Sequence, residues 1–152
     1  MKMNKRGVTL IELVVVMAII AIGAMLLVPN MGPWIQSYRL RTATRDITST
    51  LRTAQMKAVS NNMEHRVSFD PVARTYILQR NSGGWVDEGS AQTLPTGISI
   101  ATNFGNTLTF NPSSTTTPGI TADITLQHTQ NAKLGPRIIR VLSSTGRIAI
   151  LQ

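Results

Sequence analysis

At its amino terminus the chain reads Gly7-Val8-Thr9-Leu10-Ile11-Glu12-Leu13, and no further charge follows through Val28. The apolar run from Val8 to Val28 covers 21 residues. A helix of that length reaches about 31 Å, roughly the thickness of a bilayer's hydrocarbon core. We therefore expect residues 8–28 to form a transmembrane helix. A carboxylate near its start costs about 2–3 kcal/mol or more in lipid, so Glu12 is a candidate functional residue.

The residues before Gly7 carry three positive charges, on Lys2, Lys5 and Arg6, and no negative one. Such a segment tends to stay in the cytoplasm, so the rest of the chain is expected on the other side of the membrane. A conventional signal peptide would have a shorter apolar core followed by small residues in an A-x-A arrangement. Here the suitable small residue, Gly7, precedes the apolar run.

This combination resembles the class III signal of type IV pilins and type II secretion pseudopilins. The resemblance implies that a membrane-embedded prepilin peptidase removes residues 1–7 as a leader, by cutting after Gly7, and N-methylates Val8. It also implies that Glu12 meets the free amine of a neighbouring subunit during filament assembly, and a carboxylate can neutralise such an amine in low dielectric. The family usually has phenylalanine at the position of Val8. The alternative is an ordinary single-pass anchor with an unrelated glutamate.

Length and composition limit the size and the chemistry of the domain that follows the apolar run. Its 152 residues leave room for one anchor helix and one modest domain. There is no cysteine, so no disulfide and no thiol chemistry are available. The formal net charge is +8. Loss of the three leader cations leaves twelve Lys and Arg against seven Asp and Glu, a side-chain charge of +5.

Residues 29–61 are expected to continue the helix outside the membrane. Pro29 should kink it, and Gly32-Pro33 should weaken it again a turn later. Asn61-Asn62 is typical of a helix end. A stripe of Arg41, Arg45 and Arg52 is interpreted as a solvated face, with contact to a neighbouring subunit or an anionic partner as the alternative. Apolar residues spaced by three and four predict the buried face: Leu40, Ala43, Ile47, Leu51, Ala54 and Ala58.

From His65 onward the apolar pattern alternates, which predicts short strands over residues 62–152. Residues 66–69 and 75–79 form an expected hairpin, and Trp85 begins the next strand. Residues 111–119 form a polar loop rich in Pro, Gly, Ser and Thr. The fold class is therefore α+β, a long helix on an antiparallel sheet. Further strands are expected at 98–101, 107–110, 120–127, 137–142 and 147–151.

The carboxy-terminal half resembles the GspH/FimT group, through Leu108-Thr109-Phe110-Asn111-Pro112, the loop ending in Gly119, and Thr145-Gly146-Arg147-Ile148. The resemblance implies a minor pilin or pseudopilin, a structural subunit of a type IV pilus or a type II secretion pseudopilus. Its expected partners are other pilins, the prepilin peptidase and the inner membrane. The domain after the anchor is then expected to be periplasmic.

A second function class rests on four cations near the carboxy terminus: Lys133, Arg137, Arg140 and Arg147, with no acidic residue from Lys133 to Gln152. These residues could contact the phosphates of DNA, as in a DNA-uptake minor pilin. DNA-binding FimT members carry a Gly-Arg-x-Arg motif. This chain has Gly146-Arg147-Ile148-Ala149, which lacks the second arginine.

The sequence offers little for catalysis. His65 and His128 are its only histidines, and both are expected to face solvent on separate strands. Neither has a cysteine or paired carboxylate at metal-ligand spacing. No activated serine motif or phosphate-binding loop is evident. We therefore expect no metal, no cofactor and no enzymatic activity.

Overall fold

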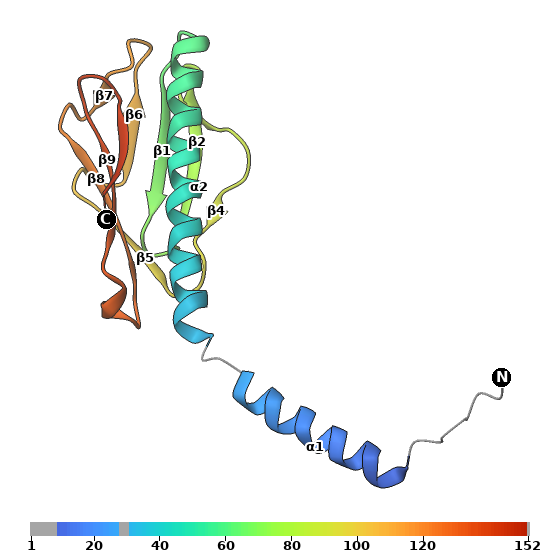
Figure 1. Cartoon of the computed structure of the whole chain (residues 1–152). Coiled ribbons are helices and arrows are strands. Elements are labelled where there is room, and N and C mark those ends of the chain that lie inside the picture. The colour runs from blue at the N-terminus through green and yellow to red at the C-terminus, as the bar shows by residue number, and fades with distance from the viewer. Residues whose placement is uncertain (1–8, 28–30, 152) are drawn as a thin grey trace, which may run out of the picture. The chain divides into compact units, whose positions relative to one another are not determined.

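The computed structural model describes residues 9–27 and 31–151. The chain divides into two compact units, residues 1–34 and residues 35–152. The first contains α1 (Leu10–Leu27) and the second contains most of α2 (Gly32–Ser60), followed by the strands (Figure 1). The predictions for Gly7, Val8 and Pro29 lie outside the described residues.

Helix α2 begins at Gly32, after the non-helical Met31, so Gly32-Pro33 lies at the start of a helix and its predicted weakening stays a prediction. Proline is tolerated in a first helical turn because the amide hydrogens there have no partner within the helix. The predicted apolar face is confirmed: all six of its residues are buried. Thr44 and Thr48 are buried with them, and each hydroxyl donates a 2.7 Å hydrogen bond to the carbonyl four residues earlier. Because these bonds satisfy the hydroxyls, the buried face accommodates both threonines.

The strands form two antiparallel sheets rather than one. Sheet A has the order β3-β2-β1-β6-β7, with β4 also paired to β2, and sheet B has the order β10-β9-β8-β5. A short 3₁₀ helix, η1 (Ala132–Leu134), precedes β9. The strands of sheet A are β1 (His65–Asp70), β2 (Thr75–Asn81), β3 (Trp85–Asp87), β4 (Gln92–Thr93), β6 (Thr107–Phe110) and β7 (Thr116–Thr117). The strands of sheet B are β5 (Ile98–Thr102), β8 (Ala122–His128), β9 (Arg137–Val141) and β10 (Ile148–Leu151).

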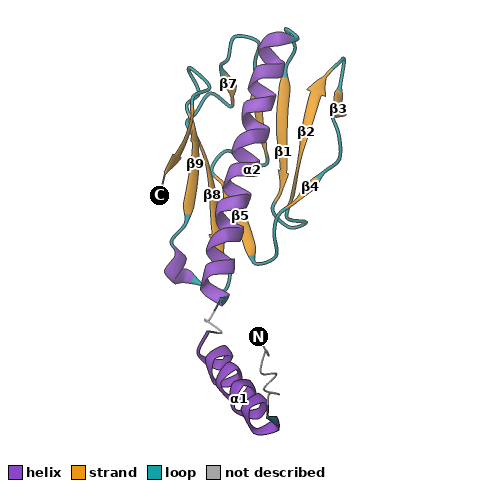
Figure 2. Ribbon diagram, turned by 45° about the vertical axis from the view of Figure 1, so that its right-hand side comes forward, coloured by secondary structure: helices purple, strands orange, loops and turns teal. Residues whose placement is uncertain are grey.

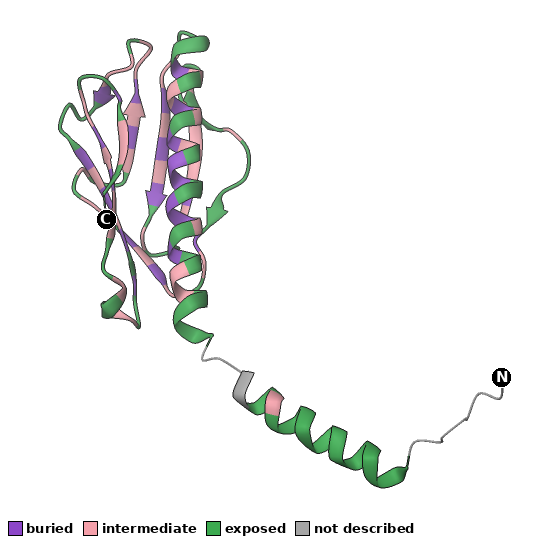
Figure 3. Ribbon diagram, viewed as in Figure 1, coloured by how far each residue is buried: buried purple, intermediate pink, exposed green. Residues whose placement is uncertain are grey.

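Helix α2 packs against both sheets. Strands β1 and β2 lie on one side of it and β8 and β9 on the other (Figure 2). Its buried residues share one core with inward-facing residues of both sheets, among them Leu108 and Phe110 of β6 and Ile124 and Ile139 of sheet B. Figure 3 shows this buried stripe along α2. The α+β class is confirmed, with two small sheets sharing one helix.

The predicted hairpin of β1 and β2 is confirmed, with Val67 opposite Leu78 and Asp70 opposite Thr75. At its turn, the Asp70 carboxylate accepts hydrogen bonds of 2.9 and 2.8 Å from the amides of Val72 and Ala73. Aspartate is common in such turns for this reason. The sequence missed β4, β7 and η1, each only two or three residues long.

Candidate functional site

Glu12 lies in the first turn of α1 and is exposed. The residue before the helix, Thr9, acts as its N-cap: its Oγ1 accepts a 3.3 Å hydrogen bond from the amide of Glu12. The pattern Thr9-Leu10-Ile11-Glu12 is that of a capping box, in which the glutamate occupies the third helical position. A carboxylate there also interacts favourably with the positive end of the helix dipole. Thr9 therefore caps α1, and Glu12 stands at the capping-box position, which our sequence interpretation did not include.

The large apolar side chains described in α1, between Leu10 and Met25, are exposed on every side of the helix. The exposed fraction of its large hydrophobic residues runs from 48% at Val16 to 81% at Met25. A helix that is apolar on every side is normally covered by lipid or by other helices. Among the described residues, however, no helix reaches the length and hydropathy of a membrane span. The membrane span at residues 8–28 stays a prediction.

Arg140, one of the four carboxy-terminal cations, is engaged within the fold. It lies directly opposite Asp123 across the β8–β9 pair. Its Nε and Nη2 donate to the two oxygens of that carboxylate, each at 2.8 Å. These hydrogen bonds hold the pKa of Asp123 below its ordinary value and raise the pKa of Arg140. A bidentate pair of this kind orients both side chains. Arg140 thus ties β9 to β8.

The other three cations do not gather around Arg140. Side chains three residues apart on a strand lie on opposite faces of the sheet, so Arg137 and Arg140 point to opposite sides of sheet B. Arg147 lies in the turn before β10, close to Leu142, whose amide donates to its carbonyl. That end of β9 is about 17 Å from Arg137. Lys133 is exposed on η1. The structure therefore does not assemble the four cations into one patch.

The prediction that both histidines face solvent is wrong. His65 is 0% exposed and His128 is 7% exposed. His65 shares the inward face of β1 with Val67 and Phe69, and His128 shares that of β8 with Ala122, Ile124 and Leu126. Because alternate strand residues share a face, extending the apolar pattern by one step to each histidine would have predicted this burial.

His65 adjoins an ion pair that ties the β3–β4 connection to α2. Lys57 Nζ lies 2.7 Å from Glu88 Oε1. His65 Nδ1 lies 2.9 Å from the carbonyl of Met63, and its Nε2 lies 3.5 Å from Glu88 Oε2. The last distance is too long for a strong hydrogen bond. The hydrogen bond from Lys57 chiefly lowers the pKa of Glu88. This arrangement fastens a loop, and within residues 9–27 and 31–151 no cluster of three potential metal ligands occurs.

Comparison with known proteins gives two findings. Residues 2–28 match the family described as the prokaryotic N-terminal methylation motif. No curated protein matches the sequence.

The fold is similar to that of two solved bacterial proteins. One is the type IV minor pilin FimU of Pseudomonas aeruginosa, with a TM-score of 0.65 and 17% identity over 79% of this chain and 93% of that chain. The other is the minor pseudopilin EpsH of the type 2 secretion system of Vibrio cholerae, with a TM-score of 0.64 and 13% identity over 74% of this chain and 96% of that chain.

Proposed function

Since the chain is pilin-like, with the amino-terminal methylation motif and the fold of FimU and EpsH, we propose that it is a minor pilin or pseudopilin. It serves as a structural subunit of a bacterial envelope filament and takes part in assembly rather than catalysis. One observation carries the proposal: the apolar surface of α1 is uncovered and bears a single carboxylate in its first turn, whereas residues 35–152 bury a core of their own. An autonomous domain leaves α1 available to other subunits.

The proposed mechanism begins at the membrane. The basic leader stays in the cytoplasm, residues 8–28 hold the precursor in the inner membrane, and the carboxy-terminal domain lies in the periplasm. The prepilin peptidase cuts after Gly7 and methylates the new amine of Val8. Cleavage removes three cations and creates one cationic terminus.

Assembly then transfers α1 from lipid into a bundle formed with the helices of other pilins. There the Glu12 carboxylate pairs with the amine of a neighbouring subunit. Two such charges in low dielectric attract strongly, and leaving one of them unpaired costs about 3–5 kcal/mol. This cost selects the axial position at which a subunit enters the filament.

A DNA-uptake function has weaker support. It requires a continuous cationic surface to follow a phosphate backbone. Arg140 is paired with Asp123, and Arg137 and Arg147 lie at opposite ends of β9. The chain also lacks the second arginine of the Gly-Arg-x-Arg motif after Gly146, which further weakens the DNA-uptake hypothesis.

The decisive experiment compares two substitutions at Glu12. Glutamine also serves as the third residue of a capping box, so Glu12→Gln removes the charge and retains the box, whereas Glu12→Ala removes both. A filament subunit should lose incorporation in both variants at an unchanged membrane level. Co-purification with co-produced pilins measures incorporation, and intact mass checks for cleavage after Gly7. Gly7→Glu is the control that should remain uncut.

The result separates three explanations. If Glu12 serves only the helix cap, Glu12→Gln will assemble like the wild type and Glu12→Ala will not. If α1 is a plain anchor, both variants will insert at least as well as the wild type and nothing will co-purify. A chain that is never cut after Gly7 would contradict the pilin function itself.

A further inference from the structure

A hollow of about 420 Å³ lies between α2 and the β9–β10 end of sheet B. It is lined by Arg41, Thr44 and Arg45 of α2, by Arg137 of β9 and by Ile150 of β10. We call it the arginine hollow. The two arginines of α2 belong to the predicted solvated stripe, and Arg137 belongs to the carboxy-terminal cations. The fold thus joins two groups of cations that are almost a hundred residues apart in sequence.

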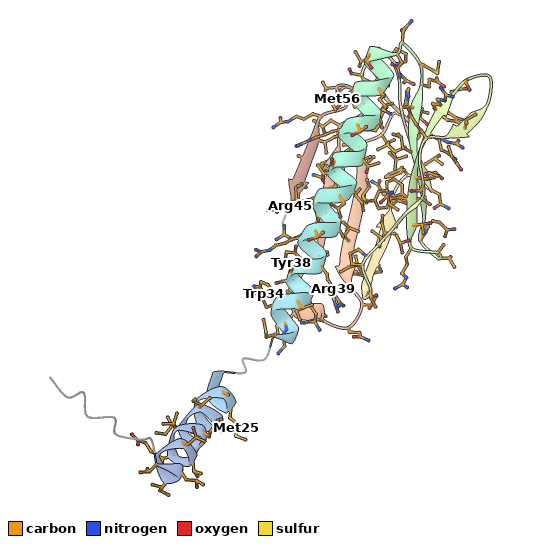
Figure 4. All side chains as sticks on the ribbon, turned by 90° about the vertical axis from the view of Figure 1, so that its right-hand side faces the viewer. Met25, Trp34, Tyr38, Arg39, Arg45 and Met56 are labelled. Atoms are coloured by element: carbon orange, nitrogen blue, oxygen red, sulfur yellow. The ribbon has the colours of Figure 1, made fainter. Side chains whose placement is uncertain are left out.

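The geometry of the secondary structure explains this meeting. Arg41 and Arg45 are one helical turn apart and therefore lie one above the other on α2. Arg137 occupies the same face of β9 as Ile139 and Val141, which are buried in the core shared with α2. In the next strand, Ile150 lies opposite Ile139. Figure 4 shows Arg45 on α2, more than a turn beyond Arg39.

Among residues 31–151, no carboxylate lines the arginine hollow. Within these residues, the lysine and arginine ion pairs are Lys57–Glu88 and Arg140–Asp123, and none involves the three arginines of the hollow. Asp46 follows Arg45 in sequence but lines a different hollow, together with Tyr76 of sheet A. Three guanidinium groups that share one concavity without a counter-charge repel each other, and a bound anion would relieve that repulsion.

The hollow also adjoins an open sheet edge. Strand β10 is the outermost strand of sheet B. Two of its apolar residues are partly exposed, Ile150 at 42% and Leu151 at 36%. An edge strand with unpaired backbone groups can accept an additional strand from another chain. The side chains of such a strand on the α2 side would lie beside Arg41 and Arg45.

We propose that the arginine hollow and the β10 edge together bind an acidic, extended segment of a different filament subunit. The proposal rests on the proposed function. Main-chain hydrogen bonds would hold the segment along β10, its carboxylates on the α2 side would pair with the three arginines, and apolar side chains on its opposite face would lie beside Leu151. Arginine is suited to this because its planar fork binds carboxylates in bidentate fashion.

Charge favours an acidic segment of a different subunit over a second copy of the chain in the arginine hollow. After loss of the leader the chain has twelve Lys and Arg against seven Asp and Glu. Two of the acids, Glu88 and Asp123, are already paired. Bringing two copies together at this face would oppose like charges, which disfavours association of the two copies. The arginine hollow would thus favour unlike neighbours and disfavour a filament made of this subunit alone.

The test uses the full-length chain in a neutral detergent. The probe is a labelled peptide of alternating valine and glutamate, and fluorescence anisotropy measures binding. A peptide of alternating valine and glutamine is the matched control for charge. We expect the acidic peptide to bind, and the double variant R41E/R45E to weaken binding tenfold or more. Arg52→Glu changes the same residue type on the same helix outside the hollow, and it should leave binding within about twofold.

Three outcomes would overturn the proposal. Equal binding of the two peptides would show that charge does not select the occupant. Equal binding by the wild type and R41E/R45E would place the peptide elsewhere. If duplex DNA or phosphatidylglycerol vesicles bind through Arg41 and Arg45 while the peptide does not, the hollow serves phosphate. Circular dichroism of R41E/R45E checks folding, and R41Q/R45Q repeats the test without charge reversal.

The experiments distinguish failure of the arginine-hollow proposal from failure of the proposed pilin function. The same R41E/R45E variant should still be cut after Gly7, because the hollow is remote in sequence from the cleavage site. Normal cleavage with normal co-purification would refute the role of the hollow in assembly and leave the pilin function intact. An uncut wild type would refute the pilin function.

Discussion

Gly146 is the position at which a single methyl group should disturb the sheet B edge most. It lies in the turn between β9 and β10 with a φ of +62°, and a Cβ there would lie 2.5 Å from Gln55 Nε2 of α2 and 2.5 Å from the carbonyl oxygen of Ser114. Gly83 provides the matched control. Its φ is +83°, and no atom lies within 4 Å of its would-be Cβ. Both substitutions by alanine impose backbone strain, but only Gly146→Ala adds a steric clash.

The magnitudes follow from these two terms. Alanine in the left-handed region costs about 1–2 kcal/mol. Forcing a methyl group into filled space costs about 1–3 kcal/mol more. We therefore expect Gly83→Ala to lower the free energy of unfolding by about 1–2 kcal/mol and Gly146→Ala by about 2–5 kcal/mol. For a unit of this size each kcal/mol corresponds to roughly 3–6 °C in Tm.

Urea and thermal unfolding of both variants, followed by circular dichroism, measure the difference. The double variant Gln55→Ala/Gly146→Ala should recover part of the loss, because it removes one of the two clashing atoms and leaves the carbonyl of Ser114. Equal destabilisation by Gly83→Ala and Gly146→Ala would refute the argument. It would mean that the β9–β10 turn does not pack closely against α2 and Ser114.

Two further predictions concern the autonomy and the acid stability of the domain. A fragment beginning at Asn30 should be a soluble, folded monomer because residues 35–152 contain the whole described core; sizing and circular dichroism decide, and an unfolded fragment would contradict the domain boundary. The pKa values of Glu88 and Asp123 in the folded state lie below their ordinary values of 4.5 and 3.8. Their ion pairs therefore stabilise the fold fully above pH about 4.5 and less as the pH falls through the lowered values. Unfolding midpoints should drop in that range, and Glu88→Gln with Asp123→Asn should flatten the dependence; an unchanged slope would show that neither pair contributes.

Local patterns predicted much of this fold. The spacing of Leu40, Ile47 and Leu51 predicted the buried face of α2, and the strand at 107–110 was predicted with its observed bounds. Such features depend on residues within one or two turns of each other, where periodicity is informative. The division into two sheets was not predictable in this way, because it depends on which strands pair across long stretches of chain.

The residues of the candidate site also differ in whether the sequence alone could identify them. The methylation motif is contiguous, so Gly7, Val8 and Glu12 could be proposed directly from sequence. Arg137 could be identified as a cation, but its meeting with Arg41 and Arg45 depends on packing between α2 and β9. The burial of the two histidines could have been predicted from sequence. Each lies at the end of an alternating apolar pattern, and the pleat of the strand places it on the same inward face as the apolar residues.

Arg137 and Arg140 illustrate why counting charges did not locate the proposed binding surface. They are the same residue type on the same five-residue strand, but the pleat directs them to opposite faces. On one face Asp123 neutralises Arg140 and fixes the register of β8 with β9. On the other, Arg137 lines a hollow together with Arg41 and Arg45, and no carboxylate of the described residues lines it. The first arginine therefore contributes to folding, and the second remains available to a partner. For a filament subunit this division has a consequence, because the uncompensated charge lies beside an open strand edge, where it favours an acidic neighbour and opposes another copy of the same chain.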